Sequence, residues 1–487
     1  GWICAEQRCC DAETGQQQAG QASICVVWTN RHALILSAAA ENVMGLFGKK
    51  FADGDWFSAT VLLRWGSGNC WISGYFRDLL SGRLRILCAA AGHWQLKDEL
   101  MWVRLSGLIS AGGQCVVAVV LLMATEVMQQ CRAEDPLVLV SSFASGADGG
   151  ITAFRLQTST ATLQPVNRTS GIPQPFFFDV SPDRRQLFSI HAETFGGSAT
   201  EELAAWKLDA ATGQLTPVNR RTTRGTASCF VEVDRTGRTV LCANYASGSV
   251  VAWRIQSDGS LSEPSAFVQH AGSSVNPARQ KEPHAHCFVI SPDNRFAYAA
   301  DLGTDQVLCY RLNAATGELQ PNVQPFVRTL PGSGPRHLTF DPAGRHLYVI
   351  NELLNSVTLF DFHAETGFLV EQQTIATLPA DFQGESYCAD LKITPNGRFL
   401  YGTNRGHDSV AMYRIAEDGR LTLIGIEPSR GKGPQNLAVT RDGQLLLCGN
   451  MPGNSLAIFR IDQETGRLQA AGDLVEIRGP SCIRILD

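Results

Sequence analysis

The sequence predicts an all-β fold: a seven-bladed β-propeller with four-stranded antiparallel blades and a split closing blade, preceded by a poorly defined N-terminal extension. Two observations lead to this prediction. From residue 136 onward the chain repeats one pattern six times, and self-similarity at a period of this length is typical of propellers and related arrays. The two ends of the repetitive part also supply complementary fragments of a seventh copy, which closes a ring and leaves no open sheet edge.

Each copy contains four short strand-like segments joined by tight turns. Residues 288–321 and 338–372 show the pattern clearly: apolar segments alternate with Ser-Pro-Asp-Asn or Asp-Pro-Ala-Gly turns and with Gly-containing turns. Proline fixes φ at the first corner, and Asn, Asp or Gly tolerates the positive φ needed at the next. The same turn position recurs about every 50 residues, close to the length of one blade. It is occupied by Arg184, Gly237, Asn294, Gly344, Gly397 and Gly443.

The seventh blade is predicted to be shared between the two ends of the repeat region. Residues 137–166 match the second, third and fourth strands of a copy, and residues 479–487 match a first strand. A β-sandwich or an open array is the alternative arrangement of such strands. The propeller is favoured because the two terminal pieces are the missing parts of one repeat.

The first part of the chain differs from the repeats. Residues 1–127 hold most of the tryptophans and show no sustained helical or strand period. We therefore expect an N-terminal extension of unknown structure, disordered or not native to the functional protein, followed by a propeller domain at 128–487. Residues 105–125 are uncharged and long enough to cross a bilayer, and the same run also fits a secretory h-region. A membrane location is expected only if that run is a genuine anchor.

Composition restricts the partners. The formal net charge is −5 and charged residues make up 18% of the chain, so there is no electrostatic reason to expect nucleic acid. A small molecule is the expected partner, bound by a monomer. Cysteines in the repeats stand singly in apolar segments, which suits a reducing compartment and predicts a cytoplasmic location. The histidines are too widely spaced for a legible metal motif, so neither a metal nor another cofactor is predicted.

Polar residues gather at one end of the predicted channel. In a propeller blade, the loop that leads into the first strand and the loop that leaves the second strand lie on the same face, near the axis. For any single residue a structural role is the simpler reading, but polar residues at equivalent positions of neighbouring blades favour a pocket. The candidates include His284, His286, Arg336, His337, Asn351, Glu352, Asp390, Asn404, Arg405 and His407.

The residue types in this set indicate acid/base chemistry on an anion. Arginine presents a planar, permanently charged fork that matches phosphate or carboxylate. Glutamate and histidine exchange protons near neutral pH when burial and neighbouring charges shift their pKa values. No GxSxG, GxGxxG or Walker loop occurs, and Ser333 in GSGPRH reads as a loop serine rather than a nucleophile.

Three segments carry a resemblance to a known family. ISPDNRFAYAADLGTDQV, GPRHLTFDPAGRHLYVINEL and ADLKITPNGRFLYGTNR resemble the seven-bladed lactonase propellers, typified by bacterial 6-phosphogluconolactonase and similar to fungal carboxy-cis,cis-muconate cyclase. The resemblance covers residues 136–487. It implies a metal-free catalytic site formed by His286, Arg336, Glu352 and Arg405, with either Glu352 or His286 as the base.

The resemblance implies hydrolysis of 6-phosphogluconolactone to 6-phosphogluconate, a step of the pentose phosphate pathway. Alternatives are a muconate-type lactonizing cycloisomerase, which would use the same anion clamp, and a non-catalytic interaction module, which would not need this set. Three features depart from the family pattern: His284, His407 and a polar insert at 272–281 that is expected to reshape the channel mouth. The residues expected to bind substrate are His284, Asn351, His337, Asn404 and His407.

Overall fold

The computed structural model describes residues 135–486 and five strands in the N-terminal part of the chain. The chain divides into two units, residues 1–133 and 134–487. In the first unit the five strands form one antiparallel sheet, in the order β2-β1-β3-β4-β5. These strands are β1 (Ile24–Trp28), β2 (Ile35–Ala38), β3 (Phe57–Trp65), β4 (Gly68–Phe76) and β5 (Leu84–Ala90). Residues 1–127 show no sustained strand period, so this sheet was not expected.

The candidate membrane run at 105–125 lies outside the described residues, and the domain boundary at 127/128 stays a prediction. In the described part of the chain, no helix has the length and hydropathy that a membrane span requires.

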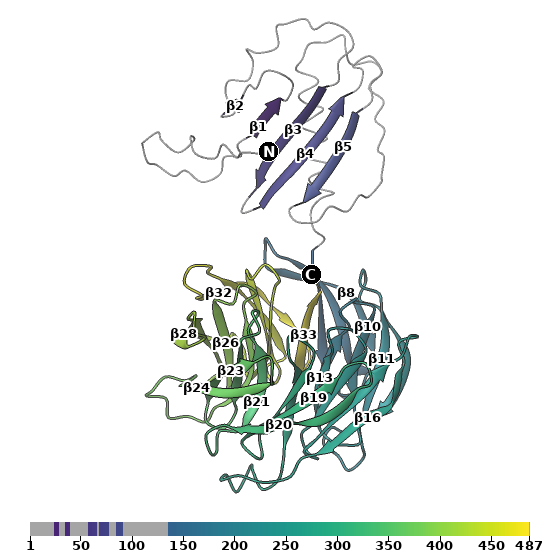
Figure 1. Ribbon diagram of the computed structural model, residues 1–487, viewed down its shortest axis with the longest axis vertical. Helices are drawn as coiled ribbons and strands as arrows, with labels where there is room; N and C mark the ends of the chain where they lie inside the picture. The colour runs from purple at the N-terminus through teal and green to yellow at the C-terminus, as the bar shows by residue number, and fades with distance from the viewer. Residues whose placement is uncertain are drawn as a thin grey trace, which may run out of the picture. The chain divides into compact units, whose positions relative to one another are not determined.

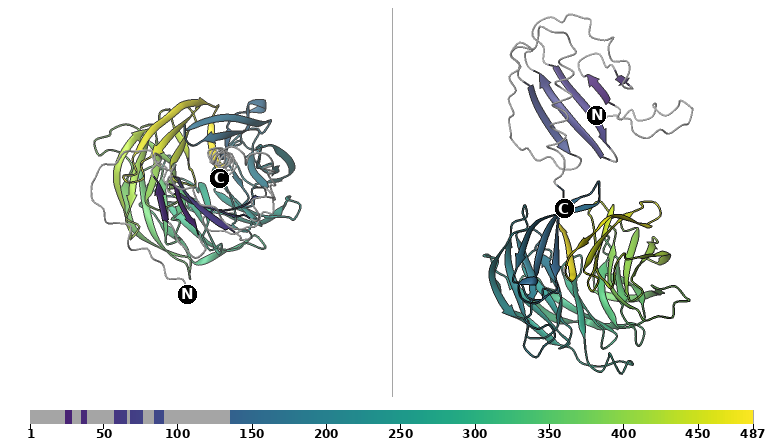
Figure 2. Two further views of the ribbon diagram at one scale, coloured as in Figure 1. Left: turned by 90° about the horizontal axis from the view of Figure 1, so that it is seen from above. Right: turned by 180° about the vertical axis from the view of Figure 1, so that it is seen from behind.

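The second unit is a seven-bladed β-propeller (Figures 1 and 2), which confirms the predicted fold class. Each blade is a four-stranded antiparallel sheet, and the first strands of successive blades contact one another around the axis. The first strands, in order around the ring, are β9 (Phe178–Val180), β13 (Ser228–Val233), β17 (Ala285–Ile290), β21 (Pro335–Phe340), β25 (Tyr387–Ile393), β29 (Pro434–Val439) and β33 (Pro480–Leu486).

The second strands are almost entirely buried, because each lies between two other strands of its blade and is covered on its faces by the neighbouring blades. They are β10 (Gln186–His191), β14 (Thr239–Asn244), β18 (Phe296–Asp301), β22 (His346–Asn351), β26 (Phe399–Arg405), β30 (Leu445–Asn450) and β6 (Leu137–Ser142). The third strands are β11 (Glu202–Leu208), β15 (Ser249–Ile255), β19 (Gln306–Asn313), β23 (Ser356–His363), β27 (Ser409–Ile415), β31 (Ser455–Ile461) and β7 (Gly150–Gln157).

The fourth strands form the rim and are the most exposed. They are β12 (Leu215–Thr222), β16 (Leu261–Gln269), β20 (Glu318–Arg328), β24 (Phe368–Ala376), β28 (Leu421–Pro428), β32 (Leu468–Glu476) and β8 (Thr162–Ser170). A short 3₁₀ turn, η1 (Gly146–Asp148), precedes β7.

The turn between first and second strands has the predicted backbone conformation. Gly344 has φ +65°, Asn294 has φ +64°, and Arg184 adopts φ +59° at the equivalent position. Glycine and asparagine reach this left-handed region at little cost, whereas Arg184 does so because the rest of the turn imposes it. The repeat therefore determines the turn even where one copy lacks the favourable residue.

The closing blade is built from both ends of the chain, as predicted. Strand β33 pairs antiparallel with β6, with Leu486 opposite Leu137, and Figure 1 shows the yellow C-terminal strand beside strands from the blue part of the chain. The hydroxyls of Ser141 and Ser481 lie 2.9 Å apart across this seam. Strand pairing and side-chain contacts at this seam therefore couple residues from opposite ends of the propeller sequence.

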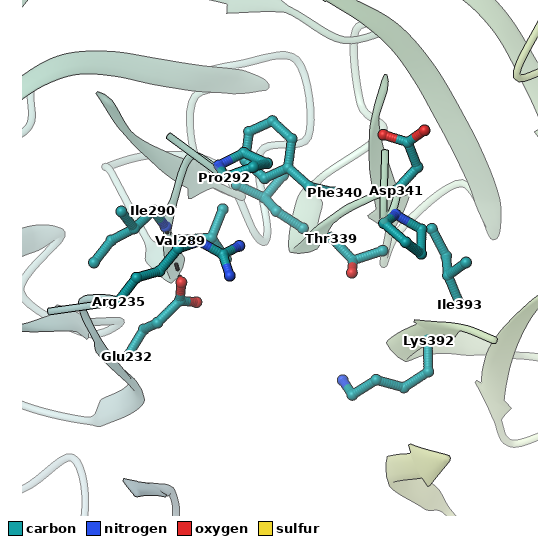
Figure 3. A pocket seen from close by; sticks show the side chains of 12 residues that line it. Glu232, Arg235, Val289, Ile290, Pro292, Thr339, Phe340, Asp341, Lys392 and Ile393 are labelled. Atoms are coloured by element: carbon teal, nitrogen blue, oxygen red, sulfur yellow. Dashed lines mark hydrogen bonds between the residues drawn. The ribbon is translucent and has the colours of Figure 1, made fainter. Parts of the chain in front are cut away.

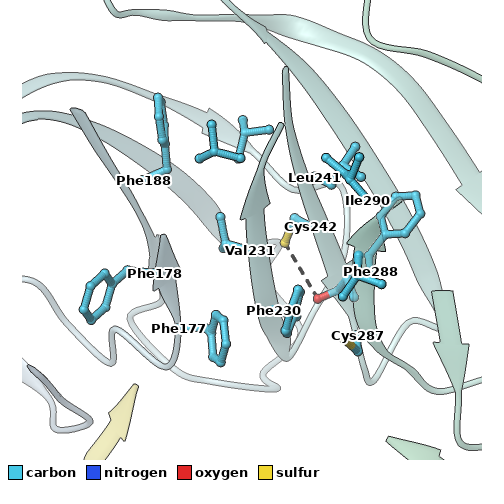
Figure 4. Packing of buried hydrophobic residues seen from close by; sticks show 14 of the residues in the cluster. Phe177, Phe178, Phe188, Phe230, Val231, Leu241, Cys242, Cys287, Phe288 and Ile290 are labelled. Carbon is cyan, nitrogen blue, oxygen red and sulfur yellow. Dashed lines mark hydrogen bonds between the residues drawn. The ribbon is translucent and has the colours of Figure 1, made fainter. Parts of the chain in front are cut away.

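Apolar packing fills the space between neighbouring blades (Figure 4). Phe188 and Leu241 come from second strands of two neighbouring blades, and Phe177, Phe230 and Phe288 lie on or next to first strands. The Phe177 and Phe230 rings stack with centroids 4.6 Å apart. All seven cysteines in residues 135–486 are free and buried, so they act as small core residues, as their apolar sequence context indicated.

A repeated hydrogen bond links four successive blades. In each of the first three, a buried tyrosine of the second strand donates its hydroxyl hydrogen to the carbonyl of a glycine in the outer turn of the next blade. A neutral bond of this kind contributes about 1 kcal/mol to stability. The three pairs are Tyr298 to Gly367 at 2.8 Å, Tyr348 to Gly419 at 2.7 Å, and Tyr401 to Gly466 at 2.9 Å.

Candidate active site

His286 and Arg336 occupy the same special position on two neighbouring first strands. In β17 the pairing with β18 shifts between Ala285 and Cys287, and in β21 the pairing with β22 shifts between Pro335 and His337. The residue inside each shift is an extra residue, so each strand carries a β-bulge there. A bulge re-aims the side chain of its extra residue. His286 and Arg336 therefore lie at the same end of the two inner strands.

Glu352 is the centre of an ion cluster at this end of the channel. It follows the last residue of β22, and its Oε2 accepts hydrogen bonds from Arg336 Nε at 3.0 Å and from an Nη of Arg405 at 2.8 Å. Its Oε1 accepts a hydrogen bond from an Nη of Arg279 at 2.7 Å. Three predicted catalytic residues, Arg336, Glu352 and Arg405, are therefore in direct contact.

The three arginines differ in exposure. The Arg336 side chain is 1% exposed, whereas those of Arg405 and Arg279 are 26% and 34% exposed. Arg336 also donates to the Ala389 carbonyl at 2.6 Å. Arg405 donates to two carbonyls of the inner strand of its own blade, β25. The buried arginine is thus fixed on several sides, and the other two present part of their guanidinium groups to solvent.

The charges of the three arginines together affect the pKa of Glu352 more than its burial does. Burial alone would raise the pKa of Glu352, but Arg405, Arg336 and Arg279 outweigh burial and lower that pKa to about 2. Burial and the neighbouring Arg405 lower the pKa of Arg336 to about 10, so it remains charged at neutral pH. Three positive charges and one negative charge leave a net charge of +2. Such a site attracts an anion.

His286 lies close to this cluster but is uncharged at neutral pH. Burial, followed by the positive charge of Arg336, lowers the pKa of His286 well below 6.5. Its Nδ1 lies 3.6 Å from the Cys229 sulfur, so Nε2 is the nitrogen available to a ligand. Its ring also lies edge-on to Tyr245, with centroids 5.4 Å apart.

His337 lies next along β21 and belongs to a buried polar chain. Its Nδ1 lies 2.9 Å from a carboxylate oxygen of Asp390, and its Nε2 is buried without a hydrogen-bond partner. Burial and Arg336 lower the pKa of His337 to about 4, against the opposing effect of Asp390. The His286 and His337 rings are 5.3 Å apart. The structure therefore brings His337 beside His286, within the wall of the channel.

His284 joins the site through Tyr245. The His284 ring stacks on the Tyr245 ring at 4.6 Å, and its Nδ1 lies 3.0 Å from the Tyr245 carbonyl oxygen. The Tyr245 hydroxyl accepts a hydrogen bond from Arg279 at 3.2 Å. Two residues, Tyr245 and Arg279, therefore link His284 to Glu352.

The other three predicted substrate-binding residues make contacts with nearby strands and loops. Asn351 donates to the hydroxyls of Ser356 and Thr358 at 3.0 and 2.9 Å. Asn404 donates to the Thr377 carbonyl at 2.9 Å. The His407 ring is edge-on to Phe382 at 4.7 Å, and its Nδ1 lies 2.7 Å from the Ser409 hydroxyl. These contacts shape the loops around Glu352 and Arg405, and a substrate role for the three residues stays a prediction.

Arg279 and Tyr245 were not among the site residues predicted from the sequence. Tyr245 could have been found, because it follows an asparagine at the end of its second strand, as Glu352 and Arg405 do in theirs. Arg279 lies in the polar insert at 272–281, which has no counterpart in the other repeats. No signal in the repeat pattern pointed to that residue.

A separate cavity opens at the opposite ends of the first strands (Figure 3). Its volume is about 480 Å³, and its lining includes Glu232, Arg235, Thr339, Phe340 and Lys392. Glu232 accepts a hydrogen bond from the Ile290 backbone N–H at 3.0 Å. This cavity shares no lining residue with the Glu352 cluster, so the channel has two chemically distinct mouths. Within residues 135–486, no group of His, Cys, Asp and Glu side chains is arranged to hold a metal ion.

Fold and site together define a class of protein: a seven-bladed propeller that holds arginines, a glutamate and histidines at one channel mouth. The family model described as "Lactonase, 7-bladed beta-propeller" matches residues 137–485. The chain belongs to this lactonase family. The predicted family and the predicted enzyme class, a lactonase and hence a carboxylic ester hydrolase, are confirmed at this level.

Three relatives illustrate the similarity. The chain is 31% identical over 350 residues to the 6-phosphogluconolactonase of Bacillus subtilis (strain 168), which covers 71% of this chain and 97% of the relative. It is 29% identical over 357 residues to the 6-phosphogluconolactonase of Formosa agariphila, covering 72% and 99%. The solved structure of a periplasmic gluconolactonase from Pseudomonas aeruginosa has a TM-score of 0.68 at 30% identity and covers 72% of this chain and 99% of that one.

Proposed function

We propose that the protein hydrolyses a phosphorylated sugar lactone, with 6-phosphogluconolactone as substrate and 6-phosphogluconate as product. The observation that carries the proposal is the net charge of +2 around Glu352, formed by three arginines against one carboxylate. A phosphate group brings a charge of about −1.5 to −2 at pH 7. Substrate and site are therefore matched in charge, and the names of two relatives agree with this choice.

Arg336 and Arg405 are proposed to bind the two oxygen-rich ends of the substrate, the lactone carbonyl and the phosphate. Arg336 is the better candidate for the carbonyl, because it is buried and held in one orientation. A preorganised donor stabilises the oxyanion that forms when water attacks the carbonyl carbon, by about 3 kcal/mol. Removal of Arg336 should therefore reduce kcat strongly.

His286 and Glu352 are the two candidates for acid/base catalysis, and their electrostatics favour His286. Glu352 has a pKa of about 2 and is tied to three arginines, so it is a poor proton acceptor and a strong organiser of the arginines. His286 is neutral and has Nε2 available. Burial is the main cause of the low pKa of His286 and the charge of Arg336 is the second. A bound phosphate would offset the arginine charges and so raise that pKa, which favours general-base catalysis.

The proposed reaction conserves atoms and protons. Water adds to the carbonyl carbon and gives up a proton to His286. The bond between that carbon and the ring oxygen then breaks, and the ring oxygen takes the proton back and becomes a hydroxyl. The new carboxylic acid ionises to a carboxylate. The proposal includes no metal ion, since a net positive cluster repels a cation.

The wider setting of the enzyme is also proposed. With this substrate it would serve the pentose phosphate pathway as a monomer. Free, buried cysteines favour a reducing compartment and therefore the cytoplasm.

The proposal is tested with freshly generated 6-phosphogluconolactone. The rate of product formation is measured for the wild type, Glu352→Gln and Arg336→Ala, and the spontaneous rate in buffer is subtracted. We expect acceleration by the wild type and a loss of at least 100-fold in both variants. A wild-type rate equal to that of buffer would overturn the proposal, and activity on a carboxy-muconate instead would favour a cycloisomerase. Binding of a protein or peptide with no turnover of either substrate would indicate an interaction module.

A further inference from the structure

The polar insert at 272–281 folds back on itself and presents Arg279. The Ser274 backbone N–H donates to the Gln280 carbonyl at 2.9 Å, and the Gln280 N–H donates to the Asn276 carbonyl at 2.8 Å. The Asn276 side chain accepts a hydrogen bond from the Arg279 N–H at 3.1 Å. These bonds close a compact loop immediately before the strand that carries His286.

A buried carboxylate, Asp305, fastens this loop to the loop that leads to Arg336. The Gln280 amide donates to Asp305 Oδ1 at 2.7 Å, and the Ser274 hydroxyl donates to Oδ2 at 2.5 Å. The same carboxylate accepts the backbone N–H groups of Gly332 and Gly334, at 2.6 and 2.7 Å. Asp305 is 2% exposed. Such charge-assisted bonds are among the stronger hydrogen bonds in proteins, so Arg279 is held in register with Arg336.

The Arg279 guanidinium is itself fixed in place but open to solvent. It donates to Glu352 Oε1 at 2.7 Å and to the Tyr245 hydroxyl at 3.2 Å, and its central carbon lies 5.8 Å from the centre of the Tyr387 ring. About a third of the side chain remains exposed. Arg279 is thus a preorganised cation with free donors, on the opposite oxygen of Glu352 from Arg336 and Arg405.

We propose that Arg279 is a substrate-binding residue that contacts the phosphate group, and that the loop at 272–281 thereby sets a preference for phosphorylated over unphosphorylated lactones. This inference rests on the proposed function. Arg336 is too buried to reach a group outside the reacting centre, whereas Arg279 and Arg405 are both partly exposed. Two arginine forks together match a phosphate dianion better than one does.

The test compares Arg279→Gln and Arg279→Lys on two substrates, 6-phosphogluconolactone and unphosphorylated glucono-δ-lactone. For Arg279→Gln we expect kcat/KM to fall 10- to 100-fold on the phosphorylated substrate, mainly through KM, and to change less than threefold on the unphosphorylated one. Arg279→Lys should retain part of the selectivity, because it keeps the charge but loses the fork. Arg345→Gln, at an exposed arginine in the turn after β21, is the matched control and should leave both rates unchanged.

The outcomes separate this inference from the proposed function. An equal loss on both substrates would show that Arg279 acts through Glu352 and would overturn the phosphate contact. No loss on either substrate would overturn it as well. Wild-type rates equal to the spontaneous rates in buffer on both lactones would overturn the proposed function and, with it, the assignment of Arg279. Melting temperatures of the variants within about 3 °C of the wild type would show that the changes are not due to unfolding.

Discussion

Arg336 Nε donates a hydrogen bond to Glu352 Oε2 at 3.0 Å, within one blade and across 16 positions of sequence. The arginine is the bulged residue of the first strand and the glutamate follows the second strand. Two adjacent antiparallel strands joined by a tight turn bring these positions together, so the blade itself assembles the pair. Arg405 and Arg279 also contact Glu352, and their charges make the site net positive.

Replacement of Glu352 by Gln should reduce both activity and stability. The variant leaves three arginines without their shared carboxylate, and Arg336 is almost fully buried. Loss of one partner of a buried ion pair costs about 3–5 kcal/mol, and the exposure of Arg405 and Arg279 reduces the expected cost to about 2–3 kcal/mol. Thermal unfolding and kcat/KM are measured side by side. Glu365→Gln, at an exposed turn position, is the control and should change neither, and an unchanged melting temperature for Glu352→Gln would contradict the coupling.

The pH dependence should identify His286 as the proton acceptor. The neutral form is the active one, and burial together with Arg336 lowers the pKa of His286 well below 6.5. The kcat/KM of the wild type should therefore be flat from pH 6.5 to pH 8 after subtraction of spontaneous hydrolysis, with its acid limb below that range. His286→Asn should lower kcat by about 10²–10⁴-fold, whereas His407→Asn should retain the profile. An acid limb centred at or above pH 6.5 would argue against His286 as the base.

The blades, their turns and the split closing blade could be predicted because each depends on local patterns that recur. The turn at Gly344 illustrates this, since a glycine at this position of the turn motif predicts the positive φ that the structure shows. The region before the repeats gave no such pattern, and the sheet from β1 to β5 was accordingly missed.

The site was predicted in part. His286, Arg336, Glu352 and Arg405 follow from the positions at which strands begin and end. Asn351 occupies such a position too, but its amide turns to hydroxyls of its own blade, and strand position does not specify that orientation. Arg279 could not be predicted from the repeats. Its contact with Glu352 depends on the fold of the loop at 272–281, and only one blade has this loop.

Replacement of Tyr348 by Phe should weaken one link between two blades without affecting the site. The hydroxyl donates to the Gly419 carbonyl at 2.7 Å, and its loss leaves that buried carbonyl without this donor. We expect a loss of about 1–2 kcal/mol, which calorimetry or denaturant unfolding measures, and unchanged kcat/KM. Tyr401→Phe removes the equivalent bond one blade further on and should have a similar effect, additive in the double variant because the two bonds share no residue. No loss of stability in either variant would contradict the role of these bonds.

Glu232 at the second mouth should make stability depend on pH. Burial raises the pKa of Glu232 from 4.5 to about 8, helped by Asp179 and opposed by the Ile290 N–H, Arg484 and Arg235. Because the folded-state pKa lies above the unfolded one, the stabilising contribution is complete below about pH 4.5 and is lost as the pH rises to about 8.

Glu232→Gln removes this loss, since Gln can still accept the Ile290 N–H hydrogen bond. The variant should match the wild type near pH 4.5 and exceed its stability by about 1–2 kcal/mol above pH 8, an amount reduced from the full pKa shift because the carboxylate lines an open cavity. Unfolding in denaturant at pH 4.5, 6.5 and 8.5 measures the difference, with exposed Glu365→Gln as the matched control. A stability difference that does not change with pH would show that Glu232 ionises normally in the folded protein.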